Sequence, residues 1–352
     1  MIGDVIKNNY DYTTSGREKI LRMMEQKNRA MIVGTGMAMP ERILTNSELE
    51  KMVDTSNQWI LSRTGIRERR ILEDDRGCSD LAVEAAMVAL REAGLEASEL
   101  ELIIVSTVTP DYPTPSTACL VQDKLGARNA AAFDLSAGCT GFVYAMASAQ
   151  GFISSGVYSN ALVIGAEVLS RVTNWNDRST CVLFGDGAGA AVLKKSDGER
   201  GIIDFSLKSD GGGAELLYIP AGGSRKPASE ESLAKQLHSI KMNGNEIFKF
   251  AVRVVDNVLE NLLTRQGMKS EMLDYLFLHQ ANDRIIEHIR KRLHLSPEKV
   301  PINLDRYGNT SSASVPMIMH EEAAAGRLKK NDLVALVAFG AGLTWGGVLL
   351  RW

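Results

Sequence analysis

The sequence is poor in cysteine and histidine and contains no long apolar run. Its 352 residues include 4 cysteines and 5 histidines, and the cysteines lie far apart, without a CxxC pair or a histidine at metal-binding spacing. This scarcity argues against a disulfide framework or a zinc site and favours a reducing, cytoplasmic compartment. No apolar stretch reaches the ~18 residues of a membrane span, and none resembles the apolar region of a signal peptide.

The chain also lacks a strong charge bias. Its 40 lysines and arginines against 43 aspartates and glutamates leave a formal net charge of −3. Nothing global therefore attracts nucleic acid or an anionic membrane, and we expect neither as a partner. The length exceeds the usual size of a single core, which predicts two halves or two domains.

The first thirty residues differ from the rest. Residues 1–30 are polar and charged, and we regard them as an N-terminal extension of unknown role, either a terminal arm or the result of an upstream start codon. The globular pattern begins at Met31. We expect residues 31–198 to form the N-terminal half and residues 199–352 the C-terminal half.

Alternating strand and helix patterns predict an α/β fold. Buried strands are expected at Leu102–Val108, Asn160–Glu167, Tyr275–Leu278 and Leu333–Phe339, and helices at Ser79–Glu92, Ser116–Leu125, Asn245–Thr264 and Arg284–Leu293. The glycine-rich run Phe184–Leu193 continues into Ala-Val-Leu, so we interpret it as a central strand and not as a phosphate-binding loop. The cluster Arg63–Arg70 is interpreted as a solvated face, with contact to a phosphate as the alternative.

Two segments of the first half recur in the second. Ser98–Val105 matches Ser270–Leu278 in pattern, and Ser155–Ala166 matches Ala325–Ala341, each pair about 170 residues apart. The fold is therefore expected to be a duplicated α/β unit with mixed sheets covered by helices.

One cysteine occupies an unusual position. The stretch Phe133–Phe142 is an apolar approach that ends in small residues and Cys139, and the helix Gly141–Ile153 that follows carries no charge. A helix that is apolar all round is buried in a large core. Cys139 is thus predicted at a strand-to-helix turn, where the positive helix end lowers a thiol pKa and favours the thiolate. The alternative is an inert buried cysteine.

Two further residues could serve as its partners. His279 ends an apolar strand, whereas His238, His288, His294 and His320 lie in polar contexts and are predicted to be solvated. Asn309 lies in a Gly- and Ser-rich turn before a second small-residue helix, where asparagine is common for turn chemistry alone. Superposing the two halves brings Cys139 close to the Asn309 loop. Cys139, His279 and Asn309 together would make a nucleophile with two hydrogen-bonding partners.

Four motifs resemble 3-oxoacyl-acyl-carrier-protein synthase III, the initiating condensing enzyme of type II fatty acid synthesis. They are Asp134–Phe142, His279–Asn282, Gly308–Ser314 and Phe339–Gly346, in this order along the chain. The resemblance runs from about Met31 to Trp352 and implies a thiolase-like fold with αβαβα layers and buried central helices. Elongating ketoacyl synthases carry a second histidine in place of the asparagine. Asn309 therefore points to the type III branch or to its chalcone-synthase-like relatives.

The resemblance also implies roles for individual residues. Cys139 would accept an acyl group from acyl-CoA, and the backbone N–H groups of Cys139 and Ala341 would form an oxyanion hole. Many relatives have glycine where Ala341 stands. His279 and Asn309 would bind the thioester oxygen of malonyl-acyl carrier protein during decarboxylation. By the same resemblance Trp59 and Arg63 would clamp the CoA adenine, and Arg178 would make another contact with CoA. Phe248 and Asn282 would line the tunnel for its pantetheine arm.

Further implications concern partners and the acyl pocket. Lys249, Arg284, Lys291 and Arg292 would form a basic surface for acyl carrier protein, although such a patch is more often only solvated. The loop of Thr114 would cross a homodimer interface and close the acyl pocket. Some relatives carry phenylalanine near that position, so threonine predicts tolerance of longer or branched primers. Neither a metal nor a cofactor is expected.

Three alternatives stay open. A type III-like synthase of a secondary-metabolite pathway would use the same triad on other acyl substrates. A cysteine hydrolase also uses Cys, His and Asn, but it would release free acid without malonyl-acyl carrier protein. A binding module without catalysis is disfavoured because all three triad positions are present.

Overall fold

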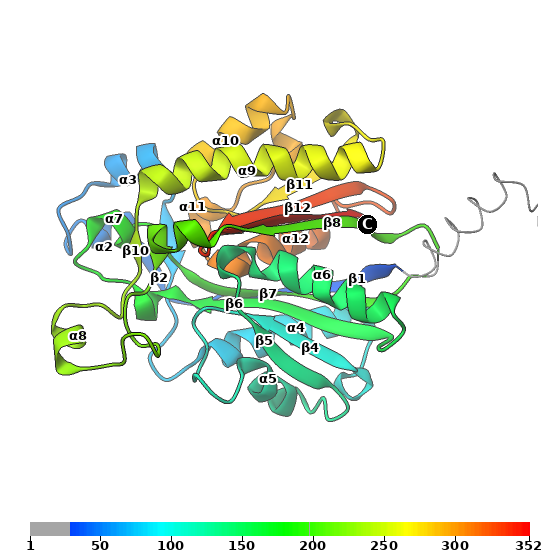
Figure 1. Cartoon of the computed structure of the whole chain (residues 1–352), viewed down its shortest axis with the longest axis horizontal. Coiled ribbons are helices and arrows are strands. Elements are labelled where there is room, and N and C mark those ends of the chain that lie inside the picture. Colours follow the sequence, from blue (N-terminus) through cyan, green and yellow to red (C-terminus); the bar gives the residue numbers. More distant parts are fainter. Residues whose placement is uncertain (1–28, 197) are drawn as a thin grey trace, which may run out of the picture.

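The computed structural model describes residues 29–196 and 198–352, so the predicted N-terminal extension lies almost wholly outside the described residues. Two mixed sheets lie one above the other, with two helices between them and further helices on both outer faces (Figure 1). This arrangement confirms the predicted α/β class and its five alternating layers. The strands of the first sheet come from residues 30–195 and those of the second from residues 201–351, on either side of the predicted boundary at 198.

The first sheet has five strands in the order β1-β7-β6-β4-β5. Its strands are β1 (Ala30–Ala38), β4 (Leu102–Ser106), β5 (Ala131–Leu135), β6 (Asn160–Val168) and β7 (Asp186–Lys195). β4 runs parallel to β5 and β6, whereas β7 runs antiparallel to β1 and β6. All of β6 and most of β7 are buried, because helices cover both faces of the sheet. The outer helices are α4 (Cys78–Ala93) and α5 (Thr117–Leu125).

The second sheet has four strands in the order β11-β12-β13-β8. Its strands are β8 (Gly201–Ser209), β11 (Tyr275–Leu278), β12 (Leu333–Gly340) and β13 (Thr344–Arg351), and its outer helices are α9 (Gly244–Arg265) and α10 (Asp283–Arg292). The apolar stripe of α9 is buried as its spacing predicts, with Phe250, Val254, Val258 and Leu262 in one core cluster.

The middle layer consists of α6 (Gly141–Ser154) and α12 (Ser314–Ala324), the two helices that the sequence predicts to be central (Figure 1). Each is entered through one 3₁₀ turn, η2 (Gly138–Thr140) before α6 and η7 (Ser311–Ala313) before α12. These two turns contact each other, so the segments that carry Cys139 and Asn309 meet at the junction of the halves.

Shorter elements complete the described fold. They are β2 (Ile43–Thr45), α2 (Asn46–Leu49), α3 (Asn57–Thr64), β3 (Glu68–Arg70), η1 (Ala97–Glu99), η3 (Leu169–Val172), α7 (Arg178–Cys181), η4 (Gly211–Leu216), β9 (Leu217–Tyr218), α8 (Glu230–Ala234), β10 (Lys241–Met242), η5 (Ser270–Met272), η6 (Pro297–Lys299) and α11 (Leu304–Tyr307). The run Phe184–Leu193 leads into β7, which confirms a strand there.

Two predictions of exposure are wrong. Arg69, within the cluster interpreted as a solvated face, is fully buried and donates hydrogen bonds to Leu44 O, Asn46 Oδ1 and Val182 O. His320, expected in solvent, is buried on α12 with its Nδ1 3.0 Å from Thr35 Oγ1. Both side chains find their partners on segments distant in sequence, which the local pattern does not reveal.

Candidate active site

Cys139 lies in the turn η2, between strand β5 and the central helix α6, as predicted. Gly138 precedes it with φ +55°, a conformation that glycine adopts without strain. A Cβ built on Gly340, at the end of β12, would lie 2.9 Å from the Cys139 Cβ and N and 3.2 Å from its Sγ. The second sheet therefore approaches the nucleophile so closely that only glycine fits at this position.

The predicted activation of the thiol by the helix end is not what the structure shows. Burial is the largest influence and raises the pKa of Cys139 to about 12, and the buried Glu167 carboxyl raises it further. A hydrogen bond from the Ser311 side chain lowers the pKa, but by less. Burial thus acts against the thiolate that the position of Cys139 before α6 was expected to favour.

His279 follows β11 and is almost completely buried. Its Nδ1 lies 2.7 Å from Ser314 Oγ, the first residue of α12, and its ring packs edge-on against Phe339 with centroids 5.4 Å apart. Burial lowers the pKa of His279 to about 3, so the imidazole is neutral at physiological pH. A neutral, firmly held imidazole suits hydrogen bonding to a developing negative charge better than storage of a proton.

Asn309 is held by backbone hydrogen bonds on both sides. Its N–H donates to Leu183 O at 2.8 Å, and its carbonyl accepts from Gly185 N at 3.1 Å. Its side-chain Oδ1 accepts the Ser311 N–H at 2.9 Å. The Nδ2 end of the amide is therefore the end left to donate to a substrate. Arg69 supports this arrangement, because it donates a hydrogen bond to Val182 O. The next residue, Leu183, accepts the N–H of Asn309.

Cys139, His279 and Asn309 line one cavity of about 130 Å³. The sequence predicts that these three residues converge, and the structure confirms it: they come from η2, the end of β11 and the loop before η7. Phe248 and Asn282, both predicted along the pantetheine path, line the same cavity.

A larger cavity of about 680 Å³ opens next to the first one at the surface. The two cavities have Leu183, Gly244, Phe248 and Asn282 in common, so they adjoin, and together they extend from the surface to Cys139. Trp59 and Arg63, for which the resemblance implies contact with CoA, both line the outer cavity.

Arg178 differs from its expected arrangement. The prediction pairs Trp59 with Arg63, yet the guanidinium that stacks on the indole is that of Arg178, 4.9 Å from the ring centroid. Arg178 also donates to Asp54 O at 2.9 Å. Trp59 and Arg178 therefore form a cation–π pair beside the outer cavity.

A third cavity of about 190 Å³ lies on the other side of Cys139 and is lined mainly by apolar side chains. Its lining residues are Val108, Gly138, Cys139, Leu169, Phe184, Leu217, Tyr218, Ile219, Ile240, Ser311 and Ala341. The Ala341 backbone nitrogen would lie 3.1 Å from a Cβ on Gly138, so the main chain of Ala341 runs beside the Cys139 turn. Thr114, the predicted acyl-pocket residue, is exposed and does not line this cavity in its own chain.

The basic residues proposed for carrier-protein docking do not form one free patch. Lys249 and Arg284 line the outer cavity, with Lys249 paired to Glu246 at 2.8 Å. Lys291 and Arg292 lie farther along α10, and they pair with Glu287 at 3.9 Å and with Asp256 at 2.7 Å respectively. The positive charge at the mouth therefore comes mainly from Arg63 and Arg284.

Sequence reasoning missed Glu167, a fully buried carboxyl at the end of β6. Its Oε1 lies 3.0 Å from both Ser311 Oγ and Ser312 Oγ, and its Oε2 accepts from Val108 N at 3.1 Å and from Thr109 Oγ1 at 2.8 Å. Glu167 thus connects the turn after Asn309 to the loop at Val108, which lines the third cavity. The only sign of Glu167 in the sequence is that an acidic residue directly follows the apolar run Ala161–Ala166.

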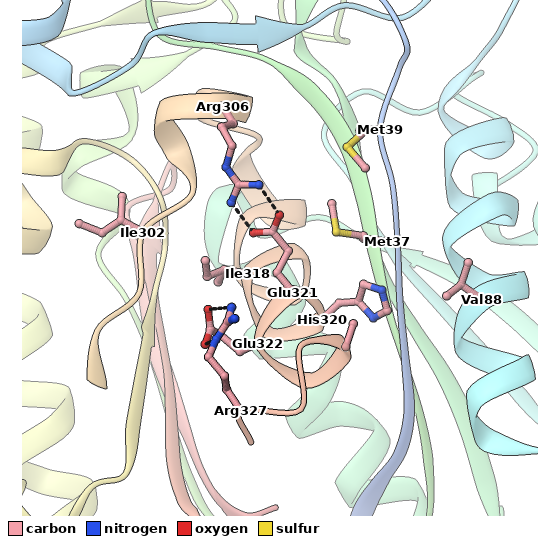
Figure 2. Close-up of a pocket in the computed structure, with 11 residues that line it drawn as sticks. Met37, Met39, Val88, Ile302, Arg306, Ile318, His320, Glu321, Glu322 and Arg327 are labelled. Carbon is pink, nitrogen blue, oxygen red and sulfur yellow. Dashed lines mark hydrogen bonds and ion pairs between the residues drawn. The ribbon is translucent and has the colours of Figure 1, made fainter. Parts of the chain in front are cut away.

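Another cavity surrounds His320 (Figure 2), and Cys139 is not among its lining residues. Its volume is about 630 Å³. Met37 of β1 and Met39, which directly follows that strand, face α12 across the cavity. Its charged side chains neutralise one another, since Arg306 pairs with Glu321 and Arg327 with Glu322. None of Cys139, His279 and Asn309 lines this cavity, so it is separate from the triad's site.

Residues 29–196 and 198–352 contain no helix long and apolar enough to cross a membrane, and no group of three His, Cys, Asp or Glu side chains placed to hold a metal ion.

Comparison with known proteins gives a consistent picture. The family model of 3-oxoacyl-[acyl-carrier-protein] synthase III matches residues 133–211, and the model of that family's C-terminal part matches residues 263–352. The chain is 56% identical over 329 residues to the beta-ketoacyl-[acyl-carrier-protein] synthase III of Caldanaerobacter subterraneus subsp. tengcongensis, with 94% of this chain and 99% of that protein covered.

Solved structures agree with this result. The 3-oxoacyl-[acyl-carrier-protein] synthase III of Aquifex aeolicus VF5 is similar to the chain with a TM-score of 0.85 and 46% identity, covering 92% of this chain and 100% of that one. The priming beta-ketosynthase of the R1128 polyketide biosynthetic pathway has a TM-score of 0.85 and 34% identity, covering 93% and 97%. The predicted thiolase-like fold is thereby confirmed.

Proposed function

The chain belongs to the 3-oxoacyl-[acyl-carrier-protein] synthase III family of condensing acyltransferases, and from this premise we propose its reaction in detail. The enzyme joins an acyl-CoA primer to malonyl-acyl carrier protein and releases CoA, CO₂ and a 3-oxoacyl-acyl carrier protein. The observation that carries the proposal is the path from the outer cavity to Cys139, with His279 and Asn309 at its inner end.

The first half-reaction transfers the acyl group. Cys139 Sγ bonds to the carbonyl carbon of the acyl-CoA thioester, and the bond from that carbon to the CoA sulfur breaks. The thiol proton ends on the departing CoA sulfur. The developing oxyanion would be bound by the N–H groups of Cys139 and Ala341, and this placement is supported by the main chain of Ala341 beside the turn of Gly138.

The second half-reaction forms the carbon–carbon bond. The bond from the malonyl methylene to its carboxylate breaks, CO₂ leaves, and the electron pair moves into the thioester as an enolate. His279 and the Asn309 Nδ2 donate hydrogen bonds to the enolate oxygen. The methylene carbon then bonds to the carbonyl carbon of acyl-Cys139, and the bond from this carbonyl carbon to Cys139 Sγ breaks. The released Cys139 thiolate takes up one proton from water, which restores the thiol. Every bond change is an acyl transfer or a decarboxylation, so we propose no redox cofactor and no metal.

Binding of CoA would use the outer cavity. The adenine would stack on both Trp59 and Arg178 once these two side chains, now in contact with each other, move apart, because a planar base gains from stacking on both an indole and a guanidinium. Arg63 at the cavity wall would pair with a phosphate. The pantetheine arm would extend past Phe248 and Asn282 to Cys139.

The acidic carrier protein would dock at the mouth of the same path. Arg284 and Lys249 line that mouth, and Lys291 and Arg292 follow on α10. Because three of these four side chains already have acidic partners, we expect Arg284 to contribute most.

The primer would occupy the apolar cavity opposite the entrance. Its volume of about 190 Å³ is well above the roughly 10–15 Å³ that a cavity needs to admit one water molecule, so primers longer than acetyl should fit. A second copy of the chain, in a homodimer, would complete this end of the primer's cavity. Strand β5 is the edge of the first sheet and is only half-buried, which makes it a template for pairing with a second copy. Thr114 would then reach the partner's acyl pocket.

One assay tests the proposal and the second candidate together. Purified enzyme is given a series of acyl-CoA primers with malonyl-acyl carrier protein, and the 3-oxoacyl product is identified by mass. We expect product from primers beyond two carbons, and loss of product in His279→Ala and Asn309→Ala. A priming role in a polyketide pathway is the second candidate, favoured by the similarity to the R1128 synthase. Product formed only with a carrier protein of such a pathway would support that candidate.

A further inference from the structure

We propose that Thr140 and Thr344 are positioning residues that hold the two N–H groups of the oxyanion hole at a fixed spacing. The inference rests on the proposed function, in which the N–H groups of Cys139 and Ala341 bind the developing oxyanion. Such donors stabilise a transition state only when both lie about 2.7–3.1 Å from the oxygen. Cys139 belongs to η2 in the first half of the chain, whereas Ala341 belongs to the turn between β12 and β13 in the second. The spacing of the two donors therefore depends on what joins these two segments.

Two threonine side chains make the hydrogen bonds between the segments. Thr140 Oγ1 lies 3.2 Å from Thr344 O and 3.0 Å from Thr344 Oγ1. Thr344 Oγ1 also lies 2.9 Å from Ala137 O, two residues before Cys139, and 2.9 Å from Ala341 O. Within the described part of the chain, no other hydrogen bond joins residues 137–141 to residues 340–344. These two hydroxyls are thus the only directional link between the segments that carry the two donors.

The link does not depend on how the hydroxyl protons are shared. Both acceptors within reach of the Thr140 proton belong to Thr344, so this hydrogen bond crosses between the halves in either arrangement. The Thr344 proton crosses as well when it goes to Ala137 O or to Thr140 Oγ1. When it goes to Ala341 O instead, it fixes the carbonyl of the residue that supplies the second donor. Each threonine therefore contributes in every arrangement.

The main chains of the two segments approach each other closely at the same place. A Cβ built on Gly138 would lie 3.1 Å from both Ala341 N and Ala341 O, and Thr140 is fully buried. Close contact of this kind prevents the segments from moving nearer to each other, but it does not prevent them from separating or sliding. Hydrogen bonds resist both movements because they are directional and short-ranged.

Acyl transfer to Cys139 tests the proposal in single turnovers over a range of acyl-CoA concentrations. Thr140→Val and Thr344→Val each replace a hydroxyl by a methyl group of similar size. In both we expect kcat of acyl transfer to fall about 10- to 100-fold and KM to stay within about twofold, since a misplacement of about 1 Å lowers rates by about 100-fold. Thr344→Ser keeps the hydroxyl and should retain most of the rate. Should Thr344→Val fail to fold, Thr140→Val removes a crossing bond by itself.

The matched control is Thr117→Val. The Thr117 hydroxyl is buried and has no hydrogen-bond partner among the described residues, so its loss should leave acyl transfer unchanged.

Alkylation of Cys139 by iodoacetamide separates positioning from general damage. This reaction takes place at a saturated carbon and forms no oxyanion, so it does not use the two N–H donors. At a fixed pH its rate in Thr140→Val and Thr344→Val should stay within about twofold of the wild type. Alkylation slowed as much as acyl transfer would show that the thiol itself has moved, and this would overturn the proposal.

The remaining outcomes distinguish this inference from the proposed function. Wild-type rates of acyl transfer in Thr140→Val and Thr344→Val would refute the role of the two hydroxyls and leave the proposed function intact. Slow acyl transfer in Thr344→Ser would also refute that role, because this variant keeps the hydroxyl. Wild-type enzyme that accepts no acyl group on Cys139 would refute the proposed function, and this inference with it.

Discussion

Replacing Gly340 by alanine should displace the nucleophile. The new Cβ would lie 2.9 Å from the Cys139 N and Cβ and 3.2 Å from Sγ. Carbon atoms in contact prefer about 3.5–4.0 Å, so one of the two segments has to move by roughly 0.5–1 Å. Neither can move easily, because Gly340 ends a buried strand and Cys139 precedes a buried helix.

The cost in rate follows from this displacement. A misplacement of about 1 Å at a reacting atom lowers rates by about 100-fold. We therefore expect acylation of Cys139 in Gly340→Ala to be about 10- to 100-fold slower, and the overpacking to lower the free energy of unfolding by about 1–3 kcal/mol.

The assay is single-turnover transfer from a radiolabelled acyl-CoA, with thermal unfolding measured in parallel. Gly151→Ala is the matched control, because a Cβ at this position of α6 meets nothing within 4 Å. It should keep the wild-type rate and gain about 0.5–1 kcal/mol of stability. An acylation rate in Gly340→Ala within twofold of the wild type would refute the close-packing argument.

Three further predictions concern the thiol, the support of Asn309 and the CoA site. Because burial raises the pKa of Cys139 to about 12, the thiolate fraction should rise about tenfold per pH unit. Alkylation of Cys139 by iodoacetamide should therefore accelerate steadily from pH 7 to pH 10, and a plateau below pH 9 would contradict this. Arg69→Met removes three buried hydrogen bonds and should lower the free energy of unfolding by about 3–5 kcal/mol in denaturant titrations. A loss below 1 kcal/mol would show that these bonds are easily replaced. Trp59→Ala should raise KM for acyl-CoA about tenfold with kcat nearly unchanged, since a base stacked on an aromatic ring contributes about 1–3 kcal/mol. A changed kcat with unchanged KM would place Trp59 outside the CoA site.

The layered fold and the triad could be predicted because their signals are local. Cys139 is marked by a strand, a turn and an uncharged helix, and His279 by the end of an apolar strand. Their convergence follows from the internal repeat, which places the turns before α6 and α12 at one centre. Asn309 is recognisable only through its motif, because asparagine in a turn is common.

The residues that support the triad could not be predicted, because their contacts span the whole chain. Glu167 holds serines about 145 positions away, and Arg69 binds a carbonyl 113 positions away. Ser314 reads only as the start of a helix until His279 is placed beside it. The same reason explains the error about the thiol pKa. The start of a helix is visible in sequence, whereas the burial that raises the pKa of the thiol depends on the second sheet.

The central claim is that Cys139 carries the acyl group between the two half-reactions. Its most direct test is the intact mass of the enzyme after exposure to acyl-CoA and again after addition of malonyl-acyl carrier protein. The account predicts one acyl adduct on the wild type, its absence in Cys139→Ala, and its disappearance as the 3-oxoacyl product forms. An adduct that persists in Cys139→Ala, or one that malonyl-acyl carrier protein does not remove, would contradict it.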